Sequence, residues 1–122
     1  MKITLKNLHE ATAQEVFDQV KNHLITQGEQ SLNSGGLCLY HNANGLSCAA
    51  GCLISEEEYN PNFEMNLWGD LIKKNLVPST HSDLIGELQQ IHDQWEESAE
   101  NGMNMSDSLE ACADNHGLVF KR

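Results

Sequence analysis

The stretch LCLYHNANGLSCAAGCLI, residues 37–54, decides the fold that this sequence predicts. Residues 37–41 alternate between apolar and polar side chains, which favours a strand with one buried face. Asn44 and Gly45 then form the pair that two-residue hairpin turns prefer. Residues 46–54 return as a second strand or pass into a helix, and the small residues Ala49, Ala50 and Gly51 indicate close backbone packing. We therefore expect a β-hairpin over about residues 37–54.

Helical patterns flank this hairpin on both sides. Thr12 and Glu15 form a capping box before an apolar helical pattern, and Gly28 is a natural stop, so a helix is predicted over residues 13–27. Further helices are predicted around residues 67–74, 80–95 and 106–116, with a short helical turn at 56–59. Residues 3–5 and 118–120 read as short strands, and we find no internal repeat.

The fold expected is therefore α+β, with a small antiparallel sheet that includes the hairpin and packs against three to four amphipathic helices. A chain of 122 residues fits one domain, so residues 1–122 are assigned to a single domain.

The charge is strongly acidic, with 18 Asp and Glu against 7 Lys and Arg and a formal net charge of −11. No Lys or Arg occurs in residues 75–120, where nine carboxylates fall. Such a surface repels phosphates and anionic lipids, which argues against direct nucleic-acid binding and against a membrane role. It leaves open a protein partner with a basic face, and we expect a protein partner.

The helix predicted at residues 80–95, with its continuation to residue 100, concentrates this charge. Its apolar stripe leaves the opposite side to carboxylates: Asp83, Glu87, Asp93, Glu96, Glu97 and Glu100. One hypothesis is that this face mimics nucleic-acid phosphates and occupies a basic groove on another protein. The alternative is an ordinary solvated helix face.

Nothing near the N-terminus resembles a signal peptide, and the longest apolar run, residues 46–54, is far below the roughly 20 residues that span a bilayer. We expect a cytoplasmic protein with reduced thiols.

Cys38, His41, Cys48 and Cys52 form the pattern C-x2-H-x6-C-x3-C, which offers four soft or borderline ligands of the kind that zinc takes. The spacing is not a standard zinc set, and buried structural thiols are the competing interpretation. Cys48 could alternatively act as a nucleophile if one of the histidines served as its base; the candidates are His9, His23, His41, His81, His92 and His116.

A second cluster that could hold a metal is acidic. It comprises Glu56, Glu57, Glu58, Glu64 and Asp70, which could bind Ca²⁺ or Mg²⁺. Acids near helix starts explain the pattern better than a metal does, because the alternating calcium-loop motif is absent.

Several segments together resemble a group of short proteins from bacteriophages and prophages that have no assigned activity. They are residues 11–20, Cys38 with Tyr40, residues 45–54, Glu58-Tyr59, Val77-Pro78, His81 and residues 84–93. The resemblance implies a bacterial host cytoplasm and a phage-accessory role, and it assigns no catalytic residue.

The sequence thus predicts a non-enzymatic accessory protein that binds a host protein or another macromolecule through its acidic surface. The alternative is a small-ligand or zinc module, which could be an enzyme, centred on Cys38, Cys48 and Cys52. The oligomeric state stays open.

Overall fold

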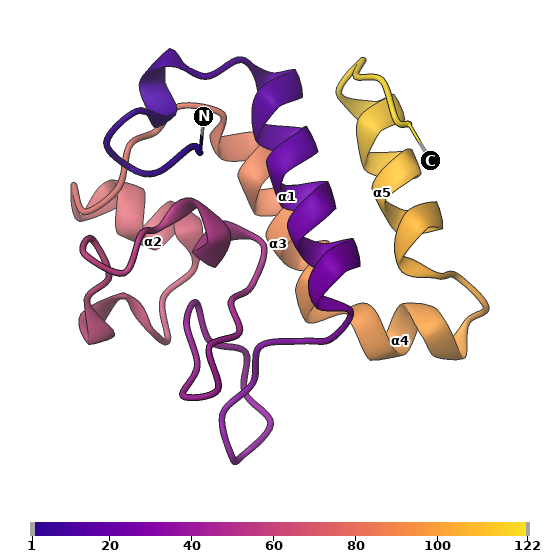
Figure 1. The fold of residues 1–122 in the computed structure, drawn as a ribbon, viewed down its shortest axis with the longest axis horizontal. Helices are drawn as coiled ribbons and strands as arrows, with labels where there is room; N and C mark the ends of the chain where they lie inside the picture. Colours follow the sequence, from indigo (N-terminus) through magenta and orange to yellow (C-terminus); the bar gives the residue numbers. More distant parts are fainter. Residues whose placement is uncertain (1, 122) are drawn as a thin grey trace.

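The computed structural model describes residues 2–121, and this part of the chain is mostly helical (Figure 1). Its α-helices are α1 (Ala13–Gln27), α2 (Trp68–Lys73), α3 (Ser82–Asp93), α4 (Trp95–Glu100) and α5 (Met105–Asn115). Short 3₁₀ helices lie at η1 (Leu8–Glu10), η2 (Ala50–Leu53) and η3 (Pro61–Phe63). None of the helices in residues 2–121 combines the length and the apolar character that a membrane span requires.

Helix α1 forms as the sequence predicts, because its ends are fixed locally. The Glu15 backbone amide donates to Thr12 Oγ1 over 3.1 Å, and the Thr12 amide donates to Glu15 Oε1 over 2.8 Å. Such caps contribute about 1 kcal/mol each. Gly28 ends the helix in the left-handed region with φ of 71°, a conformation that costs glycine little.

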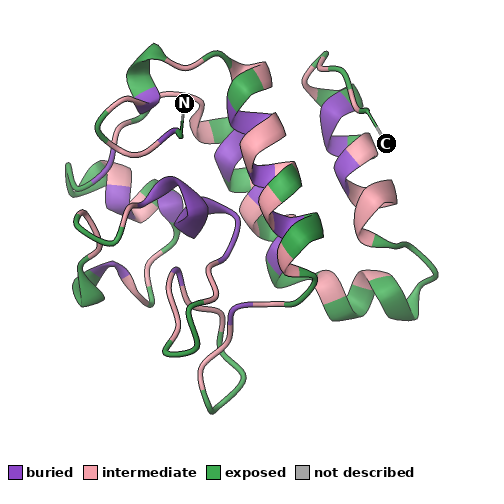
Figure 2. Cartoon of the chain, viewed as in Figure 1, coloured by how far each residue is buried: buried purple, intermediate pink, exposed green. Residues whose placement is uncertain are grey.

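The core lies where α3 packs against α1, α2 and α5, with η2 against α1 and α3 (Figures 1 and 2). The largest fully buried side chains are mainly apolar: Phe17, Leu8, Leu24, Leu53, Leu71, Ile85, Leu88, Leu109, His92, Val16, Val20 and Cys48. By contrast, α4 contributes no buried residue, and Figure 2 shows it mostly as exposed surface.

The predicted antiparallel sheet and hairpin are wrong. Within residues 2–121 the chain forms no strand, and the only pairings of strand type are two isolated antiparallel bridges, Leu32 with Cys38 and His41 with Ser47. The fold is therefore that of a mostly helical small domain rather than α+β.

Two similar loops stand where the hairpin was expected. In each loop an asparagine side chain gathers backbone amides. Asn33 Oδ1 accepts from Gly35 and Leu37, and Asn42 Oδ1 accepts from Asn44 and Leu46. The loops share the sequence Asn-x-x-Gly-Leu at a spacing of nine residues, a short repeat that our sequence analysis missed. A turn forms over residues 42–45 with Gly45 at φ of 83°, but Asn44 does not take the positive φ of the predicted two-residue hairpin turn. The turn closes a small loop and not a ladder.

The chain turns into η2 after the second loop because Gly51 lies directly on the backbone of Tyr40. A Cβ at Gly51 would stand 2.0 Å from the Tyr40 carbonyl oxygen. This close approach confirms the close backbone packing that the small residues 49–51 predicted, although the segment is a 3₁₀ helix and not a strand.

Glutamine side chains replace the strand partners that residues 3–5 and 118–120 were predicted to have. Gln19 accepts from the Ile3 amide over 2.7 Å and donates to the Ile3 carbonyl over 2.8 Å. Gln14 does the same for Val119, over 2.9 Å in both directions. Both termini are therefore attached to α1, and neither needs a sheet.

The long acidic helix predicted from residue 80 is two helices. Helix α3 begins at Ser82, later than the predicted start, and its N-cap residue His81 has φ of 58° and makes no side-chain cap hydrogen bond. Gln94 interrupts the helix, and α4 continues in a different direction (Figure 1). The carboxylates predicted on one continuous face consequently fall on separate surfaces.

Candidate functional site

The four predicted zinc ligands do not converge. Cys48 Sγ accepts from the Gly51 amide over 3.3 Å, and the Cys52 thiol donates to the Ala49 carbonyl over 3.1 Å. His41 Nε2 is engaged with the Gly51 carbonyl at 2.9 Å. Groups of three or more ligand atoms within 4.8 Å do occur among residues 2–121, and His41, Cys48 and Cys52 are in none of them.

The thiols in this region are held in the protonated form. Burial raises the pKa of Cys48 well above its ordinary value, and burial likewise raises the pKa of Cys52 to about 12. Cys48 is 1% exposed. It therefore lacks both the accessibility and the thiolate character of a nucleophile.

The candidate bases for Cys48 are engaged elsewhere. Two of them face backbone carbonyls through Nε2: His23 at Ser47 over 2.8 Å and His81 at Ala11 over 2.7 Å. His116 contacts Glu87 at 3.0 Å, and exposed His9 lies 3.6 Å from Glu10. His41 is engaged as well, and His92 is the candidate whose ring shares a cluster of ligand atoms with a cysteine of the loop region, Cys38.

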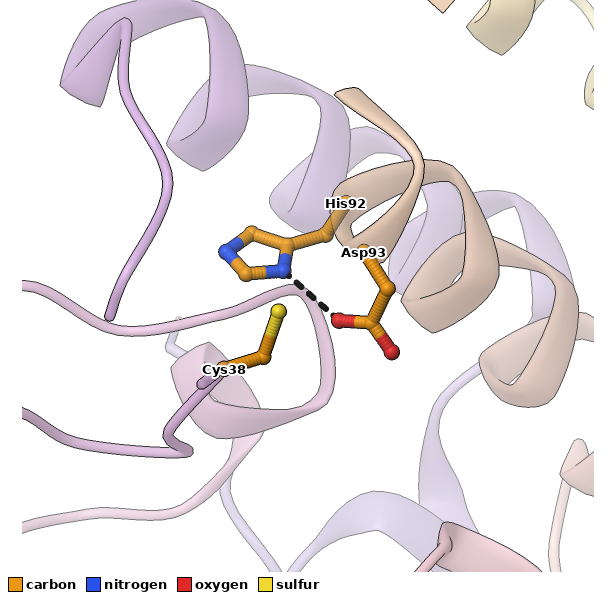
Figure 3. Close-up of side chains that lie close together, drawn as sticks. All are labelled: Cys38, His92 and Asp93. Atoms are coloured by element: carbon orange, nitrogen blue, oxygen red, sulfur yellow. Dashed lines mark hydrogen bonds and ion pairs between the residues drawn. The ribbon is translucent and has the colours of Figure 1, made fainter. Parts of the chain in front are cut away.

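Cys38, His92 and Asp93 form the cluster that the fold does assemble in this region (Figure 3). Cys38 comes from the first Asn loop, while His92 and Asp93 end α3. His92 is fully buried, and its Nδ1 lies 3.0 Å from Asp93 Oδ1. Burial, together with a hydrogen bond to Asp93, raises the pKa of the Cys38 thiol to about 12.

The hydrogen bonds of His92 show why this cluster is structural. The backbone amide of Ser31 donates to His92 Nε2 over 3.0 Å, so that nitrogen must be an acceptor. The remaining proton is then on Nδ1, where it is donated to Asp93. Neither nitrogen keeps a lone pair for a metal or for the Cys38 proton, and His92 serves instead to join α3 to the segment after α1.

The acidic run proposed as a calcium or magnesium site is also dispersed into structural hydrogen bonds. Glu58 accepts from the Leu5, Lys6 and Ser55 amides over 2.9 to 3.1 Å. Glu64 accepts from the Tyr40 amide over 2.9 Å and from the Tyr59 hydroxyl over 2.6 Å. The remaining members take other positions: Asp70 caps α2, and Glu56 and Glu57 are exposed.

The acidic face predicted on one helix is divided among three places. Asp83 and Asp93 lie along a groove between α2 and α3. Glu87 turns toward α5, where it accepts from His116 and Asn115. The rest of the face projects from α4 as exposed Glu96, Glu97 and Glu100, and no hydrogen bond or ion pair within residues 2–121 engages these three side chains.

The α2–α3 groove is the surface where charge and apolar area meet. It has a volume of about 630 Å³, and its apolar lining comes from Leu67, Trp68 and Ile72. Leu67 is 71% exposed, and neighbouring Met65 is 77% exposed. Gly69 and Gly86 line it too, and a Cβ at either position would meet nothing within 4 Å. The two glycines therefore leave the groove open to solvent, and Asp83 and Asp93 each place a carboxylate along it.

Packing of α3 on α5 creates a second mixed cluster, made of Glu87, Cys112 and His116. Our sequence analysis missed it, since it assigned no role to Cys112 and treated Glu87 only as surface charge. The C-x3-H spacing of Cys112 and His116 was a usable signal, because residues four apart lie on the same side of a helix. The contribution of Glu87 depends on tertiary packing.

No protein-family model matches this chain, and no curated protein or solved structure matches it. The geometry and the sequence are therefore what support a functional proposal.

Proposed function

We propose that this chain is a non-enzymatic binding protein with a phage-accessory role, and that it contacts a basic protein partner through the α2–α3 groove. The observation that carries the proposal is the coincidence of exposed Leu67, an apolar groove and two carboxylates on one surface. Protein interfaces combine an apolar centre with a polar rim in this way.

The charge supports a basic partner. With a net charge of −11, the molecule attracts a basic surface over long range, and Asp83 and Asp93 then fix its position at the groove. Lys73 also lines the groove, so the partner should present a carboxylate or a neutral group opposite it. An amphipathic helix with a basic edge has this chemistry.

The absence of an activated nucleophile in the loop region favours binding over catalysis. Cys38, Cys48 and Cys52 all have raised pKa values, with burial as the first cause, so each is a thiol at neutral pH. The zinc and small-ligand alternative at these cysteines finds no support in their geometry.

The test is affinity capture from a bacterial lysate with the wild type and three variants. Leu67→Ser removes the apolar anchor, and Gln90→Lys places a positive charge in the groove, on the exposed side of α3. Ile25→Ser is the matched control, since Ile25 is 47% exposed on α1, away from the groove lining. We expect a stoichiometric partner that the wild type and Ile25→Ser capture and that both groove variants lose by about tenfold or more.

Salt and the nature of the partner provide the second readout. Capture should weaken as salt is raised, because complementary charges steer the association. A partner that all variants retain equally, or whose capture does not change with salt, would refute the groove as the contact surface.

A further inference from the structure

We propose that Glu87, Cys112 and His116 form a zinc-binding site between α3 and α5. The three side chains offer a thiolate, an imidazole and a carboxylate, which are the ligand types that Zn²⁺ takes in proteins. Their ligand atoms lie within 4.8 Å of one another in the described structure. This site lies outside the groove and does not depend on the function proposed above.

The ligands come from two helices that are already fixed by the core. Cys112 lies in α5, and His116 is the C-cap residue of that helix, four positions later. Cys112 is fully buried beside Leu109 and Ala113, which are buried as well. Glu87 is on α3, between the buried Ile85 and Leu88. Because α3 packs closely on α5, the three side chains are positioned before any metal arrives.

Glu87 occupies the centre of the cluster. His116 Nε2 lies 3.0 Å from Glu87 Oε1, and Asn115 Nδ2 donates to Glu87 Oε2 over 3.2 Å. The Cys112 thiol also hydrogen-bonds Glu87, and burial with this carboxylate raises the pKa of Cys112 to about 12. Hydrogen bonds thus keep the Cys112 sulfur, the His116 Nε2 and the Glu87 carboxylate close together. A divalent cation bound by these three groups would take the place of the hydrogen-bonded protons.

Zinc binding would replace these protons in a balanced way. The Cys112 Sγ–H proton and the His116 Nε2–H proton that now faces Glu87 would both leave to solvent. His116 would then bind through Nε2 as a neutral ring, with a proton on Nδ1 that a ring neutral beforehand takes up from solvent. Asn115 would remain on Glu87 Oε2, where it would orient the carboxylate from outside the ligand shell.

Solvent reaches the site from one side. The side chain of His116 is 23% exposed and that of Glu87 is 31% exposed, while Cys112 closes the site from within. The cation therefore has an entry path, and water would complete the tetrahedron as a fourth ligand.

The Cys38–His92–Asp93 cluster provides the internal comparison. There the Ser31 amide takes the lone pair of His92 Nε2, whereas His116 Nε2 faces a carboxylate that a cation can share. The two clusters have the same three ligand types. The hydrogen bonds that occupy both nitrogens of His92 are the reason that zinc binding is proposed for the α3–α5 cluster and not for this one.

The experiment is titration of the purified, chelator-treated protein with Co²⁺ and Zn²⁺. Cobalt should give a thiolate-to-metal charge-transfer band and the visible bands of a tetrahedral site, and zinc should displace it at a ratio of one per chain. A hundredfold excess of zinc over Kd should raise Tm by about 10 °C.

Variants assign the site. Cys112→Ser should abolish the charge-transfer band, and His116→Gln, at a half-buried position, should weaken zinc binding by about 100-fold or more without a large loss of fold. Cys38→Ser is the control and should bind as the wild type does. Three results would each overturn the proposal. They are absence of the cobalt bands, unchanged zinc binding in the Cys112→Ser and His116→Gln single variants, and loss of zinc binding in Cys38→Ser.

Discussion

Substitution of Gly51 by alanine should be among the most damaging small changes in this protein. The added Cβ would lie 2.0 Å from the carbonyl oxygen, 2.8 Å from the carbonyl carbon and 3.1 Å from the Cα of Tyr40. Ordinary contact at this oxygen begins near 3.4 Å, so one backbone must move by more than about 1 Å. Both backbones are buried, which leaves no flexible side chain to absorb the shift.

The cost follows from what Tyr40 holds in place. Its carbonyl accepts from the Cys48 amide over 3.2 Å, and its own amide donates to Glu64 over 2.9 Å. Overpacking costs about 1–3 kcal/mol, and a buried hydrogen bond broken by the shift costs a further 1–3 kcal/mol. We expect Gly51→Ala to lower the free energy of unfolding by about 2–6 kcal/mol, which is a large part of the 5–15 kcal/mol of a typical domain.

Gly86→Ala is the matched control. Gly86 is exposed within α3, and a Cβ there would meet nothing within 4 Å. Alanine should therefore raise the free energy of unfolding by up to about 1 kcal/mol through helix propensity. Urea denaturation followed by far-UV circular dichroism compares the two variants with the wild type. A Gly51→Ala protein within about 0.5 kcal/mol of the wild type would refute the reasoning.

Three further predictions concern the side chains that replace a sheet and the histidines that join segments. His92→Phe should lower the free energy of unfolding in urea by about 2–4 kcal/mol, because the buried Ser31 amide loses its acceptor; no change would contradict that account. Gln14→Ala should leave global stability within about 1 kcal/mol but speed hydrogen exchange at the Val119 amide, which an unchanged exchange rate would disprove. Burial lowers the pKa of His23 from 6.5 despite its backbone hydrogen bond. The contribution of neutral His23 to the free energy of unfolding should therefore be fully present above about pH 6.5 and should be lost as the pH drops below that value. Urea unfolding from about pH 7.5 to pH 5.5 measures this decline, and His23→Gln should make it shallower; an equal slope in both proteins would count against His23.

The candidate sites were predictable only where their residues are close in sequence. Cys112 and His116 are one helical turn apart, so the α5 half of the proposed zinc site could be found from spacing alone. Glu87 joins them only through helix packing, and 25 or more residues separate it from either partner. The Cys38 to Cys52 stretch shows the opposite error, since ligand types that are dense in sequence point to different hydrogen-bond partners.

The acidic face shows the same limit at the level of a helix. Periodicity predicted one helix with carboxylates along one side, and the carboxylates are indeed absent from the core. The interruption at Gln94 sends α4 in a new direction and divides the face among the groove, α5 and solvent. Helical periodicity defines a face only as far as the helix continues, and no local signal marked the end of α3.

The sequence by itself determined the helices whose ends are capped locally. Thr12, Glu15 and Gly28 fix α1 because their hydrogen bonds span three or four residues and form in any tertiary context. Tertiary structure alone decided what the extended segments pair with. An extended backbone needs donors and acceptors but does not specify their source, and here the side chains of Gln14 and Gln19 supply them in place of strands. The predicted α+β domain is helical for that reason.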